Sequence, residues 1–401
     1  MTLLASARVR GYRSAGDVEL ALGPVTALVG EARSGKSNLL RALRLLLDPD
    51  APVAAEDLRR DGEPEIAVEA RLADGRPITR RLRPPGRGEA ELEGAPPVLF
   101  LPADRRSGAL VDVPGLSPEA GAAARLFLAE LAGPRSRDSA AAAAGALVSA
   151  VDACCAERVE GLVLLVEEPE LFLRPQTQRY LYRQLRELAS LGNQVVYSTH
   201  APAFLNVARL EELVLVRHDP ERGTQVGQPA PLEAGEAFRV VSEFDAERSE
   251  LFLARSAILV EGRTEKLVLP SVFRALGRDA DRDQVSIVEC GGKSNITVFA
   301  QICQACGIPF VVVHDRDAEE GKDPIPAEVA LNALIAEVAG SERVVVLVPD
   351  FEAVAGLEGH SNKPERAWTH FSEPGVEVPE PLERAVRLAL EAGGLSPRPA
   401  A

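Results

Sequence analysis

Cysteine is scarce in this sequence: five occur in 401 residues, and two of them, Cys154 and Cys155, are adjacent. This distribution excludes the disulfide framework of a secreted protein. Cys303 and Cys306 have CxxC spacing, but no second pair of ligands accompanies them, which argues against a zinc site. Long apolar runs are also missing, since none approaches the ~20 residues of a membrane span, and the N-terminus has no signal-peptide core. We therefore expect a cytoplasmic protein with no membrane partner.

Positive charge is in short supply as well. The sequence has 45 Lys and Arg residues against 60 Asp and Glu residues, which gives a net charge of -15. This balance excludes nucleic-acid binding by bulk electrostatics, so any DNA contact must use local basic patches or metal-bridged phosphates. Arginine is the usual cation, and the sequence contains few lysines: Lys36, Lys266, Lys293, Lys322 and Lys363.

The first of these lysines lies in a complete phosphate-binding loop. The segment VTALVGEARSGKSNLLRAL runs from an apolar strand into GxxxxGKS and then into an amphipathic helix. Gly30 and Gly35 permit the tight backbone whose N–H groups surround phosphate oxygens. Lys36 is placed to reach the β and γ phosphates, and Ser37 to ligate Mg2+ at the helix N-terminus. The segment predicts a site for ATP and Mg2+.

Two further strands end in residues suited to ATP hydrolysis. In GLVLLVEEPE, an apolar strand precedes Glu167 and Glu168. At that position the first acid would hold Mg2+, and the second would orient or deprotonate the attacking water. The strand in NQVVYSTHAPAFL ends at His200. A histidine there is ordinarily a core residue, but its strand-end position after the acidic pair favours a γ-phosphate sensor.

A second group of acids follows apolar strands in the C-terminal half. ILVEGRTEKLVLP ends its apolar run at Glu261 and has Glu265 one turn later, and FVVVHDRD ends with Asp315 and Asp317. Alternation along an extended segment puts the two aspartates on one face, with His314 and Arg316 on the other. If the two strands are neighbours in a parallel sheet, four carboxylates meet at one edge. Such a cluster favours Mg2+ or Mn2+ as the compensating cation.

These motifs together resemble a known family. The phosphate-binding loop, VEEPE and STHAPAFL resemble an ABC-type ATPase of the SMC-like branch, and the opening ARVRGYRSAGDVELAL resembles its N-terminal antiparallel strands. The segment ELFLARSAILVEGRTE resembles the entry to a Toprim domain. An SMC-like ATPase fused to Toprim is the architecture of the overcoming-lysogenization-defect (OLD) family of nucleases. The resemblance covers nearly the whole chain except its C-terminal end.

The resemblance implies a two-metal nuclease that nicks or cleaves DNA. The implied catalytic residues are Glu261, Asp315 and Lys363, the last near the scissile phosphate, with Glu168 for ATP hydrolysis. The implied ligands of the Toprim metals are Glu261, Glu265, Asp315, Asp317 and Glu352, with Glu352 preferred over Asp350. The turn ECGGKSN also places Lys293 where it could contact a DNA phosphate.

The resemblance also implies the fold class and domains. We expect an α/β protein with an ABC-type ATPase at 1–244 and a Toprim domain with a parallel sheet at 245–375. Beyond the resemblance, apolar residues at helical spacing followed by a Gly-Pro tail predict a C-terminal helix and tail at 376–401. A helical insertion at about 110–145 would help to form a homodimer. The serine-glycine signature of ABC-type enzymes is not evident, and Ser136, Arg137 or Ser139 are candidates to replace it. Arg105 or Arg106 could touch nucleotide or the partner subunit.

Other functions use the same acids and stay open. A Toprim topoisomerase needs a nucleophilic tyrosine near the metal, but all four tyrosines lie in the ATPase half. A primase would carry template-binding modules, and none is visible. A non-catalytic, ATP-driven DNA clamp or recombination accessory protein remains the main alternative. The OLD family contains a stand-alone class and a helicase-linked class tied to phage defence, and the compact chain favours the stand-alone class, so a helicase partner is expected only in the second case.

Overall fold

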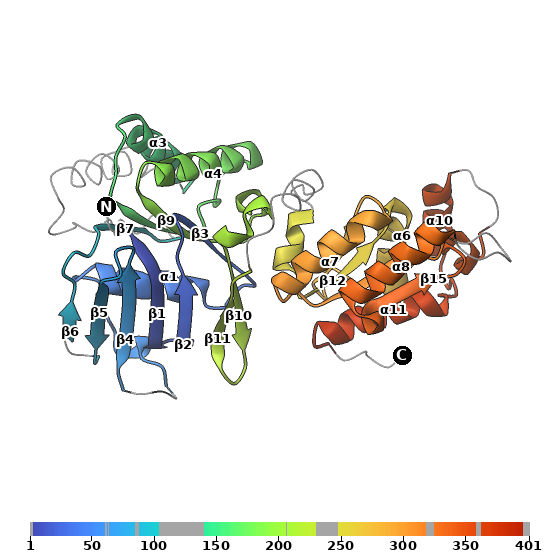
Figure 1. Ribbon diagram of the computed structural model, residues 1–401, viewed down its shortest axis with the longest axis horizontal. Coiled ribbons are helices and arrows are strands. Elements are labelled where there is room, and N and C mark those ends of the chain that lie inside the picture. Colours follow the sequence, from blue (N-terminus) through green and yellow to red (C-terminus); the bar gives the residue numbers. More distant parts are fainter. Residues whose placement is uncertain are drawn as a thin grey trace. The chain divides into compact units, whose positions relative to one another are not determined.

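The computed structural model describes residues 3–60, 62, 64–84, 88–103, 140–205, 207–229, 248–317, 325–357 and 362–395. The chain divides into two compact units, Met1–Pro231 and Leu232–Ala401 (Figure 1). The domain boundary expected near residue 245 lies outside the described residues, as do Arg105, Arg106, the candidate signature residues and most of the expected helical insertion. Among the described residues, no helix is both long and apolar enough to cross a membrane.

The N-terminal unit contains an 11-stranded sheet with an antiparallel part. Its order is β6-β5-β4-β1-β2-β11-β10-β3-β9-β8-β7. The pairings from β6 to β11 and on to β10 are antiparallel. The bounds of these strands are β1 Leu4–Tyr12, β2 Ala15–Ala21, β4 Ile66–Leu72, β5 Pro77–Leu82, β6 Glu89–Glu91, β10 Leu213–Asp219 and β11 Gly223–Gly227. The antiparallel strands predicted at the N-terminus are thus confirmed as β1 and β2.

From β10 onward, the sheet is parallel. The additional strands are β3 Val25–Val29, β9 Gln194–Thr199, β8 Val163–Glu167 and β7 Val98–Leu101. Every residue of these four strands is buried, which is typical of parallel strands covered on both faces and explains their near-continuous apolar sequences. Their carboxyl ends form the edge at which the predicted nucleotide-binding residues gather.

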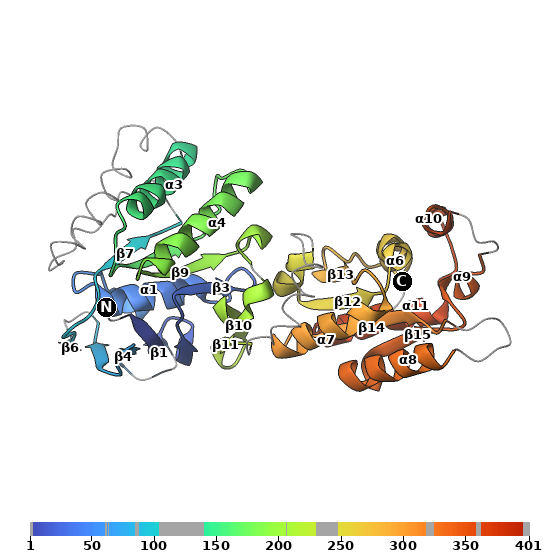
Figure 2. The same cartoon turned by 45° about the horizontal axis from the view of Figure 1, so that its top comes forward.

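Helices cover this sheet on both sides. Helix α1, Lys36–Leu47, packs its leucines against alternate residues of the antiparallel strands and of β8 and β9. Helices α3, Ala140–Ala156, and α4, Pro175–Ser190, lie together on the opposite side of the parallel strands (Figures 1 and 2). The core around α1 therefore fixes the start of that helix, where the phosphate-binding loop ends.

The C-terminal unit has a four-stranded parallel sheet in the order β13-β12-β14-β15. Its strands are β12 Ser256–Val260, β13 Val285–Glu289, β14 Phe310–Asp315 and β15 Val344–Leu347. The strands before Glu261 and Asp315 are parallel neighbours, since Val260 of β12 is paired with Val313 of β14. The condition under which the acids that follow them meet at one edge is therefore met.

Six helices flank this sheet in the described residues. Their bounds are α6 Arg263–Ala275, α7 Ile296–Ala305, α8 Pro326–Ala339, α9 Phe351–Val354, α10 Lys363–Ser372 and α11 Glu380–Ala392. Helices α6 and α11 share one core with alternate residues of the strands, and α10 packs on α6. Helices α7 and α8 contact each other and the same strands. The C-terminal helix predicted from its apolar spacing is α11.

We predict that Phe351→Ala destabilises the C-terminal unit. Phe351 begins the short helix that carries Glu352, is 1 % exposed and packs against Phe371. Loss of a fully buried phenylalanine costs about 3–5 kcal/mol in the free energy of unfolding. Urea unfolding followed by the fluorescence of Trp368, the single tryptophan, reports on this unit. Leu334→Ala, at an exposed site on α8, is the control, and equal losses in both variants would contradict the prediction.

Candidate functional site

The loop between β3 and α1 has the backbone of a phosphate-binding site. Gly30 has φ 154° and Gly35 has φ 112°, conformations that side-chain-bearing residues rarely adopt. A Cβ at Gly30 would lie 2.0 Å from the carbonyl oxygen of Val216, and one at Gly35 would lie 2.1 Å from Oγ1 of Thr224. Both predicted glycines are therefore required by the close approach of β10 and β11.

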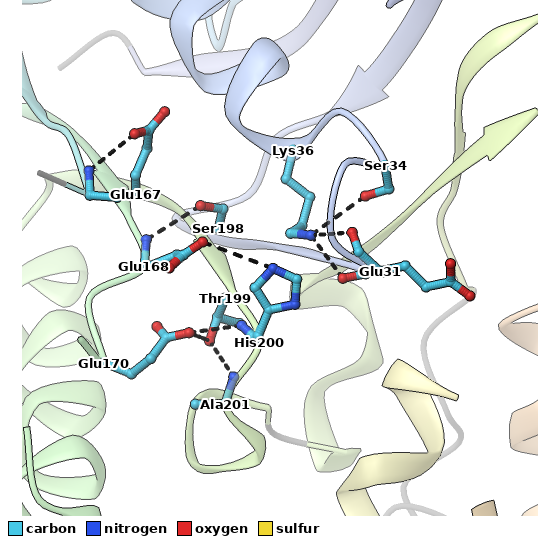
Figure 3. A network of polar contacts seen from close by, with 12 residues as sticks. Glu31, Ser34, Lys36, Glu167, Glu168, Glu170, Ser198, Thr199, His200 and Ala201 are labelled. Carbon is cyan, nitrogen blue, oxygen red and sulfur yellow. Dashed lines mark hydrogen bonds and ion pairs between the residues drawn. The ribbon is translucent and has the colours of Figure 1, made fainter. Parts of the chain in front are cut away.

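Lys36 is the first residue of α1 and is held inside this loop. Its Nζ donates hydrogen bonds to the carbonyl oxygens of Gly30 at 2.8 Å and Glu31 at 2.7 Å, and lies 3.5 Å from Oγ of Ser34 (Figure 3). Burial lowers the pKa of Lys36 to about 8, against the opposing effect of nearby glutamates. Ser37 follows in the first turn of α1 and is partly exposed.

Glu167, the last residue of β8, has a partner that the sequence did not reveal. Its carboxylate accepts hydrogen bonds from Nε of Arg41 at 3.0 Å and from Nη2 at 3.3 Å. The N–H of Ala103 also donates to it at 3.1 Å. The carboxylate predicted to hold Mg2+ is thus buried and paired with a guanidinium from α1. A charge-assisted pair of this kind compensates the acid in the absence of metal.

Glu168 and His200 lie across the ends of β8 and β9. Glu168 has φ 47°, and its N–H donates to the carbonyl oxygen of Ser198 at 2.9 Å. Its Oε1 lies 3.9 Å from Nε2 of His200 (Figure 3). Burial lowers the pKa of His200, and the Lys36 ammonium adds to that effect. The structure therefore brings the predicted Lys36, Glu168 and His200 to one place.

The C-terminal unit gathers the second predicted set of acids. Glu261 follows β12 directly, and Glu265 lies in the first turn of α6, where its Oε2 accepts the Gly262 N–H at 3.3 Å. Asp315 is the last residue of the neighbouring strand β14. The carboxyl ends of adjacent parallel strands meet at one edge of a sheet, which places these side chains together.

The carboxyl groups at this edge influence one another electrostatically. Burial, together with the charges of Glu265, Glu261, Asp317 and Glu352, raises the pKa of Asp315 to about 8. Burial also raises the pKa of Glu261 to about 7, with Asp317 as the strongest neighbouring acid. The pKa of Glu265 is raised by burial and by the charge of Glu352. Five carboxyl groups therefore interact across this sheet edge.

Asp317 lies beyond the end of β14 and is paired with a lysine. Strand β14 ends at Asp315, and Asp317 has φ 56°, so the strand alternation that would put both aspartates on one face does not reach it. Its Oδ2 accepts a hydrogen bond from Nζ of Lys293 at 2.6 Å, and the same ammonium lies 3.0 Å from Oε2 of Glu328 on α8. Burial lowers the pKa of Lys293, but these two hydrogen bonds outweigh it and the net shift is upward. Lys293 is buried and ion-paired, so in this conformation it is not open to a DNA phosphate.

Glu352 and Lys363 form an ion pair beside the same acids. Nζ of Lys363, at the start of α10, lies 3.0 Å from Oε1 of Glu352, and this hydrogen bond raises the pKa of Lys363. Asp350 instead caps α9, where its carboxylate accepts the N–H of Ala353 at 2.8 Å. The geometry therefore separates the capping acid from Glu352, whose charge reaches Asp315.

Two buried residues near these sites were not among the predicted site residues. Glu170 accepts hydrogen bonds from Thr199 and from the backbone of His200. His314 is fully buried, and its Nδ1 donates to the carbonyl oxygen of Asp315 at 2.8 Å. Burial lowers its pKa. The chemistry of these residues depends on contacts between strand ends, which residue spacing does not encode.

Family models match a segment of each half of the chain. A model described as overcoming lysogenization defect protein-like, TOPRIM domain, matches residues 252–317, which include Glu261, Glu265, Asp315 and Asp317. A model described as AAA domain, putative AbiEii toxin, Type IV TA system, matches residues 142–206, which include Glu167, Glu168 and His200.

The chain is also similar to named relatives and to solved structures. The chain is 37% identical over 223 residues to the OLD nuclease of Thermus scotoductus, covering 51% of this chain and 42% of that protein. It is 27% identical over 195 residues to the Old nuclease of Escherichia phage P2, covering 45% of this chain and 33% of that protein. The SMC head domain from Thermotoga maritima is 20% identical and covers 58% of this chain and 99% of that chain, with a TM-score of 0.35. The matched segments cover less than half the length of these two nucleases, and the Toprim model and both relatives show that the chain is similar to OLD nucleases over the matched parts.

Proposed function

We propose that this protein binds and hydrolyses ATP and is a divalent-metal-dependent DNA endonuclease. The convergence of Glu261, Glu265 and Asp315 at one sheet edge, in a unit similar to OLD nucleases, is the observation that carries this proposal. The N-terminal unit would form a homodimer that regulates cleavage. The stand-alone class and a role in phage defence belong to the same proposal.

The acids at this edge have the chemistry of a site for Mg2+ or Mn2+. Oε2 of Glu261 and Oδ1 of Asp315 are buried and have no hydrogen-bond partner within the described parts of the chain. Buried carboxylate oxygens without partners are costly unless a proton or a cation compensates them. Hard oxygen donors of this kind suit divalent cations. In the conformation described, however, no group of three or more His, Cys, Asp or Glu residues among the described ones has metal-site geometry, so binding would require these side chains to close on the ion.

The protein's own residues have separable roles in the proposed cleavage. Glu261, Glu265, Asp315, Asp317 and Glu352 would hold the metal ions. The bound ions would activate water and neutralise charge on the scissile phosphate. Lys363 lies at the edge of the group and is paired with Glu352. Once its ammonium separates from Glu352, it would stabilise the negative charge that develops on the scissile phosphate.

The proposed ATP reaction uses the end of the N-terminal sheet. The loop from Gly30 to Lys36 would bind the phosphates, with Ser37 and Glu167 as ligands of Mg2+. Glu167 would exchange its pairing with Arg41 for the cation. Glu168 would orient or deprotonate the attacking water, and His200 would contact the γ-phosphate from the neighbouring strand.

We predict that, without metal, the C-terminal unit loses stability as pH rises. Asp315 and Glu261, with pKa values of about 8 and about 7, bind protons more tightly when folded than when unfolded. Their stabilising protonation is complete below the unfolded values near pH 4 and is lost as pH rises through the folded values. In EDTA, Tm measured by Trp368 fluorescence should fall by about 4 °C or more between pH 5.5 and pH 8.5.

The matched variants decide whether these two groups cause the loss. Asp315→Asn combined with Glu261→Gln should remove most of the fall in Tm, because neither amide titrates. Glu377→Gln, at an exposed position, should retain it. The same pH dependence in the double variant and the unaltered protein would contradict the assignment of these carboxyl groups.

We predict metal-dependent cleavage of supercoiled plasmid that requires the Toprim acids. With Mg2+ or Mn2+, the intact protein should nick or linearise the plasmid, and EDTA should stop it. Asp315→Asn or Glu261→Gln should lower the rate about 100-fold or more, as loss of transition-state charge stabilisation does. Glu377→Gln is again the control, and Lys36→Ala, with and without ATP, tests whether nucleotide regulates cleavage.

The alternative function gives a different outcome in the same assay. ATP turnover without cleavage under any metal would contradict the nuclease and support an ATP-driven DNA clamp with an inactive Toprim domain. Cleavage that is equal in the intact protein and the Asp315→Asn variant would instead contradict the proposed site.

A further inference from the structure

The loop after β8 contains a third acid, Glu170, which the proposed ATP reaction does not use. Glu170 is 8% exposed, and its Oε1 accepts two hydrogen bonds, from Oγ1 of Thr199 at 2.9 Å and from the N–H of His200 at 2.8 Å (Figure 3). Its Oε2 is buried with no hydrogen-bond partner in the part of the chain that the structure describes. Burial of a half-satisfied carboxyl group opposes folding, so stability alone does not account for an acid here.

The contacts of Glu170 fix the backbone on both sides of His200. The His200 N–H is bound directly by Glu170. The next N–H, that of Ala201, donates to Oγ1 of Thr199 at 3.0 Å, and that hydroxyl donates its own hydrogen to Glu170. One carboxylate oxygen therefore organises the two peptide groups that flank the histidine.

The same strand ends are joined a second time beside Glu168. The Glu168 N–H donates to the carbonyl oxygen of Ser198 at 2.9 Å and lies 3.3 Å from Oγ of the same residue. Glu168 and Glu170 are two residues apart in the loop after β8, and Ser198 and His200 are two residues apart at the end of β9. These hydrogen bonds hold the proposed water-orienting acid, Glu168, close to the proposed phosphate sensor, His200. The distance between Oε1 of Glu168 and Nε2 of His200 is 3.9 Å.

The His200 side chain depends on this backbone support. Its side chain is 38% exposed, so packing alone leaves the ring free on one side. A catalytic group must be held within a fraction of an ångström of its productive position, and a shift of about 1 Å can cost about 100-fold in rate. The support comes from Glu170 and Thr199, which lie behind the histidine rather than facing Lys36.

We propose that Glu170 is a positioning residue for ATP hydrolysis that acts through His200. This inference rests on the proposed ATPase function of the N-terminal unit. Glu170 does not contact nucleotide; its carboxylate holds the backbone that aims the His200 ring at the γ-phosphate. The hydroxyl of Thr199 belongs to the same support.

A double-mutant cycle on the full chain tests this role. ATP turnover and the binding of a fluorescent ATP analogue would be measured for the unaltered protein, Glu170→Ala, His200→Ala and the double variant. Glu170→Ala should lower kcat by about 10- to 100-fold, by analogy with residues that orient metal ligands, and leave nucleotide binding within about 2-fold. The double variant should be no slower than His200→Ala, because residues that act as a unit are not additive.

Conservative variants separate positioning from folding. Glu170→Gln keeps an acceptor for both hydrogen bonds and should retain activity within about 5-fold, well inside the loss expected from misplacement. Thr199→Ser keeps the hydroxyl, whereas Thr199→Val removes it with little change in volume, so only the valine variant should lose turnover. Glu160→Gln, an exposed acid in the same unit, is the control for charge.

The outcomes distinguish this inference from the function on which it rests. Normal turnover in Glu170→Ala and Thr199→Val, or losses that multiply in the double variant with His200→Ala, would overturn the positioning role alone. Absence of ATP turnover in the unaltered protein would overturn the ATPase function and this inference together. Non-additive loss in kcat with rescue by glutamine would establish it.

Discussion

Mutual repulsion among carboxylates at the ends of parallel strands is the constraint on which both candidate sites depend. In the C-terminal unit, protons compensate Asp315 and Glu261, whose pKa values are raised to about 8 and about 7. An ammonium compensates Asp317, and Arg41 does the same for Glu167 in the N-terminal unit. Each compensating group is one that a divalent cation can replace, so a folded protein without metal and a metal-binding site are compatible.

The two units use one architectural solution. In each, buried parallel strands with continuous apolar sequence end in polar residues. Because the strands are hydrogen-bonded neighbours, the polar residues at their ends lie next to each other. The N-terminal unit adds a glycine loop that leads into α1, Lys36–Leu47, and the C-terminal unit adds a carboxylate from the first turn of α6, Arg263–Ala275. Packing of these helices against the sheets is therefore what aims the site residues.

The sequence was sufficient for the parts of the sites that are local. The glycine loop and the strand ends at Glu167 and Asp315 follow from short motifs and apolar runs, and the structure agrees with them. Which strands are neighbours was not predicted from the sequence; the structure shows that pairing. The sequence did not predict contacts between site residues and partners that are distant along the chain. The pairing of Arg41 with Glu167 joins residues 126 positions apart, and the capture of Asp317 by Lys293 depends on where β14 ends. Such contacts arise only once the sheets are assembled.

Calorimetric titration of Mn2+ into the nucleotide-free protein near pH 7 tests the central claim most directly. Performed in two buffers with different ionisation enthalpies, it reports both metal affinity and the number of protons released. The account predicts saturable binding with release of protons, and loss of that binding in Asp315→Asn. Absence of binding, or binding that is unchanged in Asp315→Asn, would contradict the claim that these carboxylates form a divalent-cation site.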